Sequence, residues 1–189
     1  ALPVEDPIRD AYAEAFPGLL RPLSDMPGTI RRHLRYSKML LAIQGAVLLE
    51  YHQDTARCFH ERQDVWDIPE ENAQSTNPVP YRPEYGVWRL PGEEEPTFNL
   101  TTTFVPSGRR NLTAVLVGRL ADTGGPELIL FDVPVEDQAP GPHQVEALVE
   151  QSPEIAQQFS LWRSGGSQVW TGHLHVVPVG QRLFYTEPV

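Results

Sequence analysis

Lysine, cysteine and long hydrophobic runs are scarce or missing in this chain of 189 residues. Lys38 is the only lysine, so the 15 basic residues minus one leave 14 arginines. The single cysteine, Cys58, cannot form a disulfide within the chain, which fits a reducing compartment or an exported bacterial domain that does not rely on disulfides. No run of 18 apolar residues occurs, so the sequence predicts no membrane-spanning helix between its two ends.

Catalytic signatures are missing as well. The turn at Gly165–Ser167 has no lysine and is too short for a phosphate-binding loop, and no G-x-S-x-G turn is present to hold a serine nucleophile. A net charge of −10, with no basic stripe, argues against nucleic acid as a partner. The sequence therefore predicts a protein that is not an enzyme, holds no cofactor or metal and binds no nucleic acid.

The composition is that of a folded protein. Hydrophobic residues make up 40% of the chain and charged residues 21%, which is typical of a globular domain. We expect a single domain over residues 1–189, with a helical part at 1–64, a long loop at 65–84 and a sheet part at 85–189. The chain begins within an alternating pattern at Ala1–Glu5, which predicts a strand there and indicates a fragment excised from a larger soluble region.

Capping residues and apolar periodicity predict the elements. Predicted helix starts lie at Asp6–Pro7, Ser37, Asp54, Pro142 and Ser152–Glu154. The helix capped by Ser37 covers Lys38–Tyr51, and Gly165–Gly166 ends the last helix. Predicted strands lie at 87–90, 98–104, 112–120, 127–132, 169–177 and 182–187, with a turn at 122–126.

This order predicts an α+β fold: N-terminal helices, then a mainly antiparallel sheet of about six strands, with a helix pair inserted before the C-terminal hairpin. Ile155, Phe159 and Trp162 share one helical face. The strand at 169–177 is bulky on both faces, which indicates a central strand covered on two sides. We therefore expect the C-terminal helices and hairpin to form the centre of the core.

Five residues form the candidate ligand site. Trp66, Tyr85 and Trp88 flank the long loop and could form an aromatic platform. His173 and His175 share one strand face, at a spacing that can bind zinc if a third ligand converges. The commoner use of these residue types is structural, with aromatic rings that pack a loop down and histidines on a half-buried face.

Other polar groups offer weaker alternatives. His52 with Asp54, and His60 with Asp64, could serve a metal or acid–base site, although helix ends account for them. The acidic residues of 64–71 could hold calcium but lack the order of a calcium loop. The pair Arg109–Arg110 could meet an anion.

Several phrases of the sequence carry a family resemblance. They are DPIRDAYAEAFPGLLRPLSDMPGTIRRHLRYSKMLLAIQGAVLLEYH, FVPSGRRNLTAVLVGRL, PGPHQVEALVEQSPEIAQQFSLWRSGGSQVWTGHLHVVPVG and LFYTEPV. The chain resembles an uncharacterised (UPF-type) family of large bacterial multi-pass membrane proteins, over nearly its whole length. The resemblance implies that this is the C-terminal part of a soluble region that follows several membrane helices and lies outside the cytoplasm. It implies no activity and no catalytic residues.

Three functions follow as hypotheses. The first is a non-catalytic extracytoplasmic module of a cell-membrane protein, with a role in interaction or assembly and with the membrane reached through N-terminal helices of the parent. The second is a ligand-binding module that uses the aromatic loop at 65–88. The third is a metal-dependent hydrolase, which would require that His52, His60, His173 or His175 converge with acidic residues.

Overall fold

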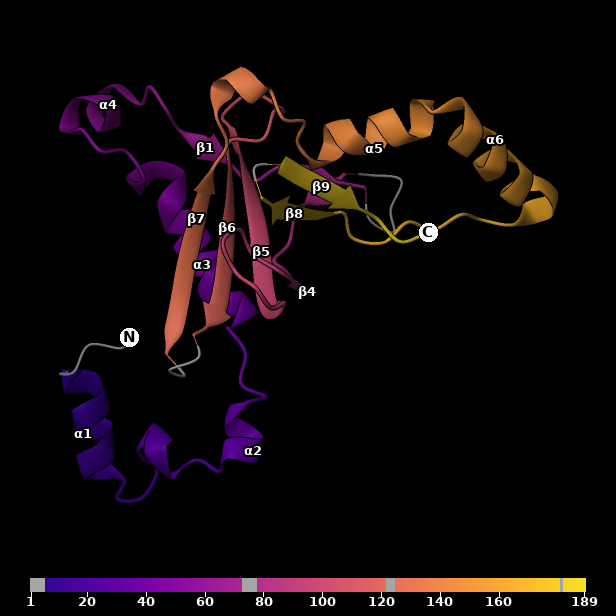
Figure 1. Cartoon of the computed structure of the whole chain (residues 1–189). Helices are drawn as coiled ribbons and strands as arrows, with labels where there is room; N and C mark the ends of the chain where they lie inside the picture. Colours follow the sequence, from indigo (N-terminus) through magenta and orange to yellow (C-terminus); the bar gives the residue numbers. More distant parts are fainter. Residues whose placement is uncertain (1–5, 73–77, 122–124, 181) are drawn as a thin grey trace.

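The computed structural model describes residues 6–72, 78–121, 125–180 and 182–189 (Figure 1). The strand predicted at Ala1–Glu5 and most of the turn predicted at 122–126 lie outside these residues. The helices are α1 (Pro7–Ala15), α2 (Gly28–Arg31), α3 (Lys38–Tyr51), α4 (Ala56–Glu61), α5 (Pro142–Gln151) and α6 (Pro153–Trp162), with short 3-10 turns η1 (Leu23–Asp25), η2 (Val135–Asp137) and η3 (Ser164–Gly166). The strands are β1 (Trp66–Asp67), β2 (Glu70–Glu71), β3 (Val79–Pro80), β4 (Glu84–Trp88), β5 (Thr97–Pro106), β6 (Ala114–Leu120), β7 (Pro126–Asp132), β8 (His175–Val179) and β9 (Arg182–Thr186).

The principal sheet is antiparallel and has five strands. β4, β5, β6 and β7 follow one another in sequence, and each pairs with the next. β1 shares with β4 the remaining edge of β5: Trp66 pairs with Pro106 at one end of that strand, and Trp88 pairs with Thr97 at the other. The predicted α+β fold with a mainly antiparallel sheet is confirmed.

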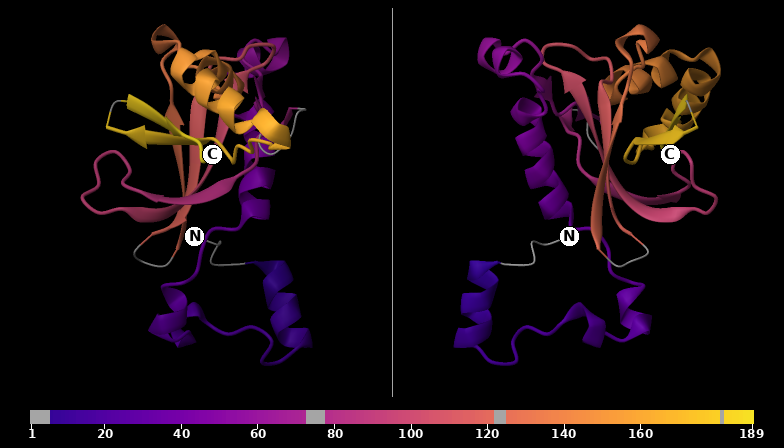
Figure 2. Two further views of the ribbon diagram at one scale, coloured as in Figure 1. Left: turned by 90° about the vertical axis from the view of Figure 1, so that its right-hand side faces the viewer. Right: turned by 60° about the vertical axis from the view of Figure 1, so that its left-hand side comes forward.

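The principal sheet is the middle of three layers (Figures 1 and 2). α3 runs along one face, and the β8–β9 hairpin covers the other, with α5 and α6 continuing on that side. Because both faces are covered, β6 is apolar at consecutive positions rather than at alternate ones.

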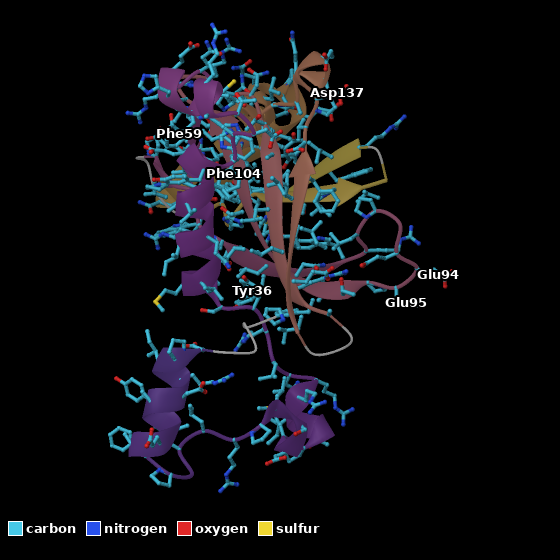
Figure 3. All side chains as sticks on the ribbon, turned by 90° about the vertical axis from the view of Figure 1, so that its left-hand side faces the viewer. Tyr36, Phe59, Glu94, Glu95, Phe104 and Asp137 are labelled. Atoms are coloured by element: carbon cyan, nitrogen blue, oxygen red, sulfur yellow. The ribbon has the colours of Figure 1, made fainter. Side chains whose placement is uncertain are left out.

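The core is divided between the two faces of the sheet. The cluster on the α3 side contains Tyr36, Leu41, Trp66, Leu100, Phe104, Ala114 and Leu116; Figure 3 shows Tyr36 and Phe104 on that side. The cluster on the hairpin side contains Leu90, Leu112, Val115, Val117 and Val176. Successive residues of a strand point to opposite faces, so β6 supplies Leu116 to one cluster and Val115 and Val117 to the other.

The helix termini are largely where the sequence predicts them. The Ser37 hydroxyl accepts a hydrogen bond from the Leu40 N–H at the start of α3, and a proline occupies the first turn of α1, α5 and α6. Gly165 and Gly166 adopt positive φ angles of 75° and 90° after α6. The predicted cap Asp54 is wrong, because the hydroxyl of Thr55 accepts the Cys58 N–H at 3.2 Å and so begins α4.

The C-terminal strand is shorter than predicted, and its hairpin lies outside the principal sheet. β8 begins at His175, and residues 168–174 form no ladder. The Gly172 N–H donates instead to the Pro188 carbonyl, at 2.8 Å. β8 and β9 form a two-stranded sheet of their own, so the prediction of a central pair is wrong.

The C-terminal helix pair contributes no residue to the two clusters that flank the sheet. Phe159 is the only buried residue of α6, and Trp162 is 50% exposed. Neither residue belongs to the two clusters that flank the sheet. The expectation that these helices form the centre of the core is therefore wrong. Helical spacing showed which residues share a face, but not which surface that face meets.

The segment predicted as one long loop at 65–84 contains three strands of two residues each. β1 joins the principal sheet, while β2 and β3 pair with each other. In that small sheet Glu71 lies opposite Val79. Strands of two residues are too short to show an alternating pattern, and the sequence alone therefore could not reveal them.

Residues 6–35 form an arm that extends away from the rest of the molecule (Figures 2 and 3). No residue of this arm is buried. Its exposed large apolar residues are Ile8, Tyr12, Phe16, Leu19, Leu20, Leu23 and Ile30. Ile8 and Tyr12 of α1 and Phe16 at its C-cap form an apolar stripe that is more than half exposed, although the rings of Tyr12 and Phe16 stack on each other.

Candidate functional site

The five candidate ligand residues lie in two separate groups. His173, His175 and Trp88 are together on the hairpin side of the sheet, where the His175 ring is 4.8 Å from that of His173 and 6.1 Å from that of Trp88. Trp66 and Tyr85 pack against the cluster on the α3 side. The structure thus brings three of the five residues together.

His173 is paired with a buried carboxylate. Its Nδ1 lies 2.8 Å from one carboxylate oxygen of Glu71 and 3.1 Å from the other. Glu71 comes from β2 and is almost completely buried, whereas His173 lies in the extended segment before β8. Since the two residues are 102 positions apart, this pair ties the small β2–β3 sheet to the C-terminal segment.

Tyr81 packs against the His173 ring of this pair. Its ring centroid is 4.5 Å from that of His173, and its hydroxyl donates to the Leu174 carbonyl at 2.7 Å. Burial raises the pKa of Tyr81 far above its usual range, and the nearby charge of Glu71 acts in the same direction. The tyrosine is therefore a neutral hydrogen-bond donor here.

A second buried carboxylate, Glu146 of α5, belongs to the same region. One of its oxygens accepts the Asn72 N–H at 2.8 Å, and the other lies 3.7 Å from His143 Nδ1 without a hydrogen bond. Burial raises the pKa of Glu146 to about 7, and the carboxylates of Glu187 and Glu71 add to the effect. We call Glu71, Glu146, Glu187 and His173 the acidic cluster.

The acidic cluster joins distant segments of the chain. Burial, followed by the charge of His173, lowers the pKa of His175, which favours the neutral ring. Among the described residues, no three histidine, cysteine or acidic side chains are placed so that they could hold a metal ion. The raised pKa values of Glu146 and Glu187 favour protonated carboxyl groups within this packed interface.

The second group, Trp66 and Tyr85, lies within packed structure. Trp66 is 5% exposed and stacks on His52 at 3.6 Å and on Phe104 at 5.4 Å. The Tyr85 hydroxyl donates to the Tyr36 carbonyl at 2.6 Å. Both rings therefore fasten their strands to the α3 side of the sheet and do not form a shared platform with Trp88.

The weaker candidates are dispersed. His52 caps the C-terminus of α3, with Nδ1 2.6 Å from the Leu48 carbonyl. Its Nε2 is 3.5 Å from an Asp64 carboxylate oxygen. Arg109 and Arg110 line a hollow of about 450 Å³, which the acidic side chains of Asp67 and Glu70 also line. That mixture of charges does not favour an anion.

A surface that the sequence reasoning missed runs along α3. Met39, Ile43, Val47 and Tyr51 recur every four residues and form one stripe on the side of the helix away from the sheet. Met39 is 73% exposed, Ile43 55% and Tyr51 67%. We call this stripe, together with Leu40, the α3 outer face.

The signal for this surface was present in the sequence. The segment MLLAIQGAVLLEY is apolar around the whole helix, and such a helix needs cover on every side. The sheet covers only the side that carries Leu41 and Gly45, which are buried. At the end of α3, Phe59 of α4 packs at 5.3 Å from the Tyr51 ring and extends the exposed apolar surface.

Within the described residues, no helix combines the length and the apolar character needed to cross a bilayer. The longest apolar helix, α3, has 14 residues.

Comparison with known sequences identifies relatives over nearly the whole chain. The chain is 40% identical to a UPF0182 protein of Microcystis aeruginosa over 184 residues, which cover 97% of this chain and 19% of that protein. It is 38% identical to UPF0182 proteins of Desulfitobacterium hafniense and Cupriavidus necator, over 100% and 97% of this chain and 20% and 21% of those proteins. The chain thus spans about one fifth of the length of these relatives.

No solved structure shows a significant match to this chain. The sequence profile of the uncharacterised protein family UPF0182 matches residues 2–162. That match covers most of the helices and the whole principal sheet. The chain therefore belongs to the uncharacterised family UPF0182.

Proposed function

We propose that this chain is a non-catalytic interaction module of a larger membrane protein, held outside the cytoplasm. Through the α3 outer face it docks onto another part of the same polypeptide. The membrane anchorage and the extracytoplasmic location rest on the family resemblance of the sequence. The docking role rests on the geometry of α3.

The α3 outer face is the observation that carries this proposal. Monomeric proteins rarely expose an extended stripe of large apolar side chains unless it binds something. Burial of one large apolar side chain contributes roughly 1.5–3 kcal/mol. Because about half of each of five side chains remains exposed, covering the face would contribute roughly 4–7 kcal/mol. That amount is comparable with the stability of a whole domain.

The length of the relatives favours a segment of the same polypeptide as the partner that packs on the α3 outer face. The chain corresponds to about 20% of each of those proteins, so they contain far more sequence that could supply a covering element. A covering segment on the same chain acts at an effective concentration of the order of millimolar, which strengthens docking without any new contact. The exposed apolar stripe of α1 offers a second surface on which another segment of the same polypeptide could pack.

The other two hypotheses have less support. A ligand site in the 65–88 segment would need Trp66, Tyr85 and Trp88 around one pocket, and they lie on different sides of the sheet. A metal-dependent hydrolase would need three converging ligands, and the described residues offer no such group. A module for interaction and assembly explains more of the observed surface than either of these hypotheses.

The test uses the full-length family protein and matched single substitutions. Ile43→Glu places a charge in the α3 outer face, and Leu148→Glu places the same charge at a similarly exposed apolar position of α5, which is 59% exposed. A photo-reactive residue at position 43 should cross-link to residues of the same polypeptide outside the matched stretch, and Ile43→Glu should increase protease sensitivity. Leu148→Glu should leave it unchanged.

Two results would contradict the proposal. Equal protease sensitivity of the two variants, with no cross-link from position 43, would show that the α3 outer face is not a docking surface. A topology reporter fused after Val189 tests the location separately, and a cytoplasmic reading would refute the extracytoplasmic placement.

A further inference from the structure

An apolar groove lies between the C-terminal helix pair and the end of the chain. It encloses about 430 Å³, which is within the range of small-molecule sites. Its lining residues are Val145, Val149, Glu154, Ile155, Gln158, Phe159, Trp162, Leu174, Tyr185, Glu187 and Val189. The walls are therefore apolar and aromatic, and two of the three polar residues among them are carboxylic acids.

Glu187 lies at the part of this groove that is nearest to other carboxylates. Burial raises the pKa of Glu187, a hydrogen bond from Thr171 opposes the effect, and the charges of Glu71 and Glu150 add to it. The charge of Glu187 in turn raises the pKa of Glu146, which does not line the groove. Glu187 therefore lies at the junction between the apolar groove and the acidic cluster, where several carboxylates repel one another.

One carboxylate oxygen in this region has no donor. Glu146 is 5% exposed, and its second carboxylate oxygen is buried and makes no hydrogen bond. The other oxygen accepts the Asn72 N–H at 2.8 Å, and the free oxygen lies 3.7 Å from His143 Nδ1. Positive charge nearby would lessen the repulsion among the carboxylates of this region. Glu146 does not line the groove, so the carboxylates of Glu154 and Glu187, which do line it, are the groups that favour positive charge in its occupant.

The aromatic lining of the groove also favours a positively charged ligand. The ring of Phe159 already carries a cation on one side, where the Arg163 guanidinium carbon lies 5.3 Å from the ring centroid. Arg163 belongs to a neighbouring hollow, which Glu150 also lines. The half-exposed indole of Trp162 lines the groove and can contact a second cation through its ring face.

We propose that this groove binds an amphiphilic amine, with the apolar body against Phe159 and Trp162 and the ammonium group near the Glu187 carboxylate. The groove is too small for a partner helix, which is about 10–12 Å across, and its volume suits a single alkyl or aryl chain. This inference concerns the opposite side of the sheet from α3 and does not depend on the proposed docking role.

The test compares three ligands of equal chain length that differ only in the head group. Decylamine, decanol and decanoate are titrated below their aggregation concentrations into the chain of residues 1–189 at about pH 8, where carboxylates are ionised. Binding is followed by calorimetry and by the indole NMR signal of Trp162. Decylamine should bind with a stoichiometry of one and about tenfold more tightly than decanol, as expected for a charge-assisted hydrogen bond. Decanoate should bind most weakly.

Two variants locate the site. Glu187→Gln should lower the affinity for decylamine about tenfold, to that of decanol, and leave the affinity for decanol unchanged. The matched control Glu95→Gln, in the exposed turn between β4 and β5 (Figure 3), should change neither affinity. Thermal unfolding of both variants confirms that they are folded.

Three outcomes would overturn the proposal. They are unsaturable uptake of all three ligands, equal affinities for decylamine and decanol, or a preference for decylamine that persists in Glu187→Gln. An unshifted Trp162 signal during saturable binding would place the ligand elsewhere and would also overturn it.

Discussion

Phe104→Ala tests where the core of this protein lies. Phe104 has 0% exposure, and its ring lies between Trp66, at 5.4 Å between ring centroids, and the α3 backbone at Gly45. A methyl group built on Gly45 would be 3.5 Å from the Phe104 ring, so the helix and the ring are in close contact. Replacement by alanine leaves a cavity at the centre of the α3-side cluster.

The magnitude follows from the buried area. An aromatic side chain buries about 150–250 Å², which corresponds to roughly 4–6 kcal/mol at 25 cal/mol per Å². Phe→Ala substitutions in cores cost about 3–5 kcal/mol. Trp162 is 50% exposed, so Trp162→Ala should cost about half as much, roughly 1.5–2.5 kcal/mol.

Urea unfolding followed by far-UV circular dichroism measures both free energies of unfolding. Phe104→Ala should lower the midpoint about twice as far as Trp162→Ala, with unchanged denaturant dependence. If Trp162→Ala lowers the midpoint as far as Phe104→Ala or further, the core lies in the C-terminal helix pair after all, as the sequence alone predicted.

Two further predictions concern a carboxylate and two glycines. The pKa of Glu146 in the folded protein, about 7, lies above its unfolded value of 4.5. Its contribution to stability is therefore full below about pH 4.5 and is lost as the pH rises through about 7. Glu146→Gln should flatten the resulting decline of the urea midpoint between about pH 5 and about pH 8, and an unchanged slope would contradict this prediction. Gly141→Ala would place its Cβ 2.2 Å from the Arg110 carbonyl oxygen and should destabilise the fold by roughly 1–3 kcal/mol. Gly45→Ala has room for its Cβ and should stabilise the helix by up to about 1 kcal/mol, and melting temperatures that rank these two variants the other way would refute this reading of their packing.

The elements that sequence predicts best are those fixed by local chemistry. Ser37 caps α3, and Pro142 and Pro153 begin α5 and α6, because capping and proline geometry depend on a few neighbouring residues. Leu100 and Phe104 share a face of β5 as their spacing predicts.

The errors arise where a partner from elsewhere in the chain decides the structure. The alternation at 169–177 predicts a long strand, but Gly172 has no space for a side chain beside Pro188, and the segment pairs with no strand before His175. Trp66, Tyr85 and Trp88 flank one loop in the sequence, but Tyr85 and Trp88 are three residues apart on β4 and therefore face opposite sides of the sheet. The partner of Glu71, His173, is 102 residues away and has no local signal.

The principal sheet also has consequences for the order in which the chain folds. β4, β5, β6 and β7 are joined by short connections, so their ladders require the closure of small loops only, and such contacts form quickly. β1 and α3 must then find a surface that this four-stranded unit creates, because their core contacts, Trp66 and Leu41, meet residues of β5 and β6. A ribosome releases α3 before that surface exists. α3, which is apolar on every side, is therefore synthesised before the sheet on which it packs, and its outer face remains exposed after the sheet has formed.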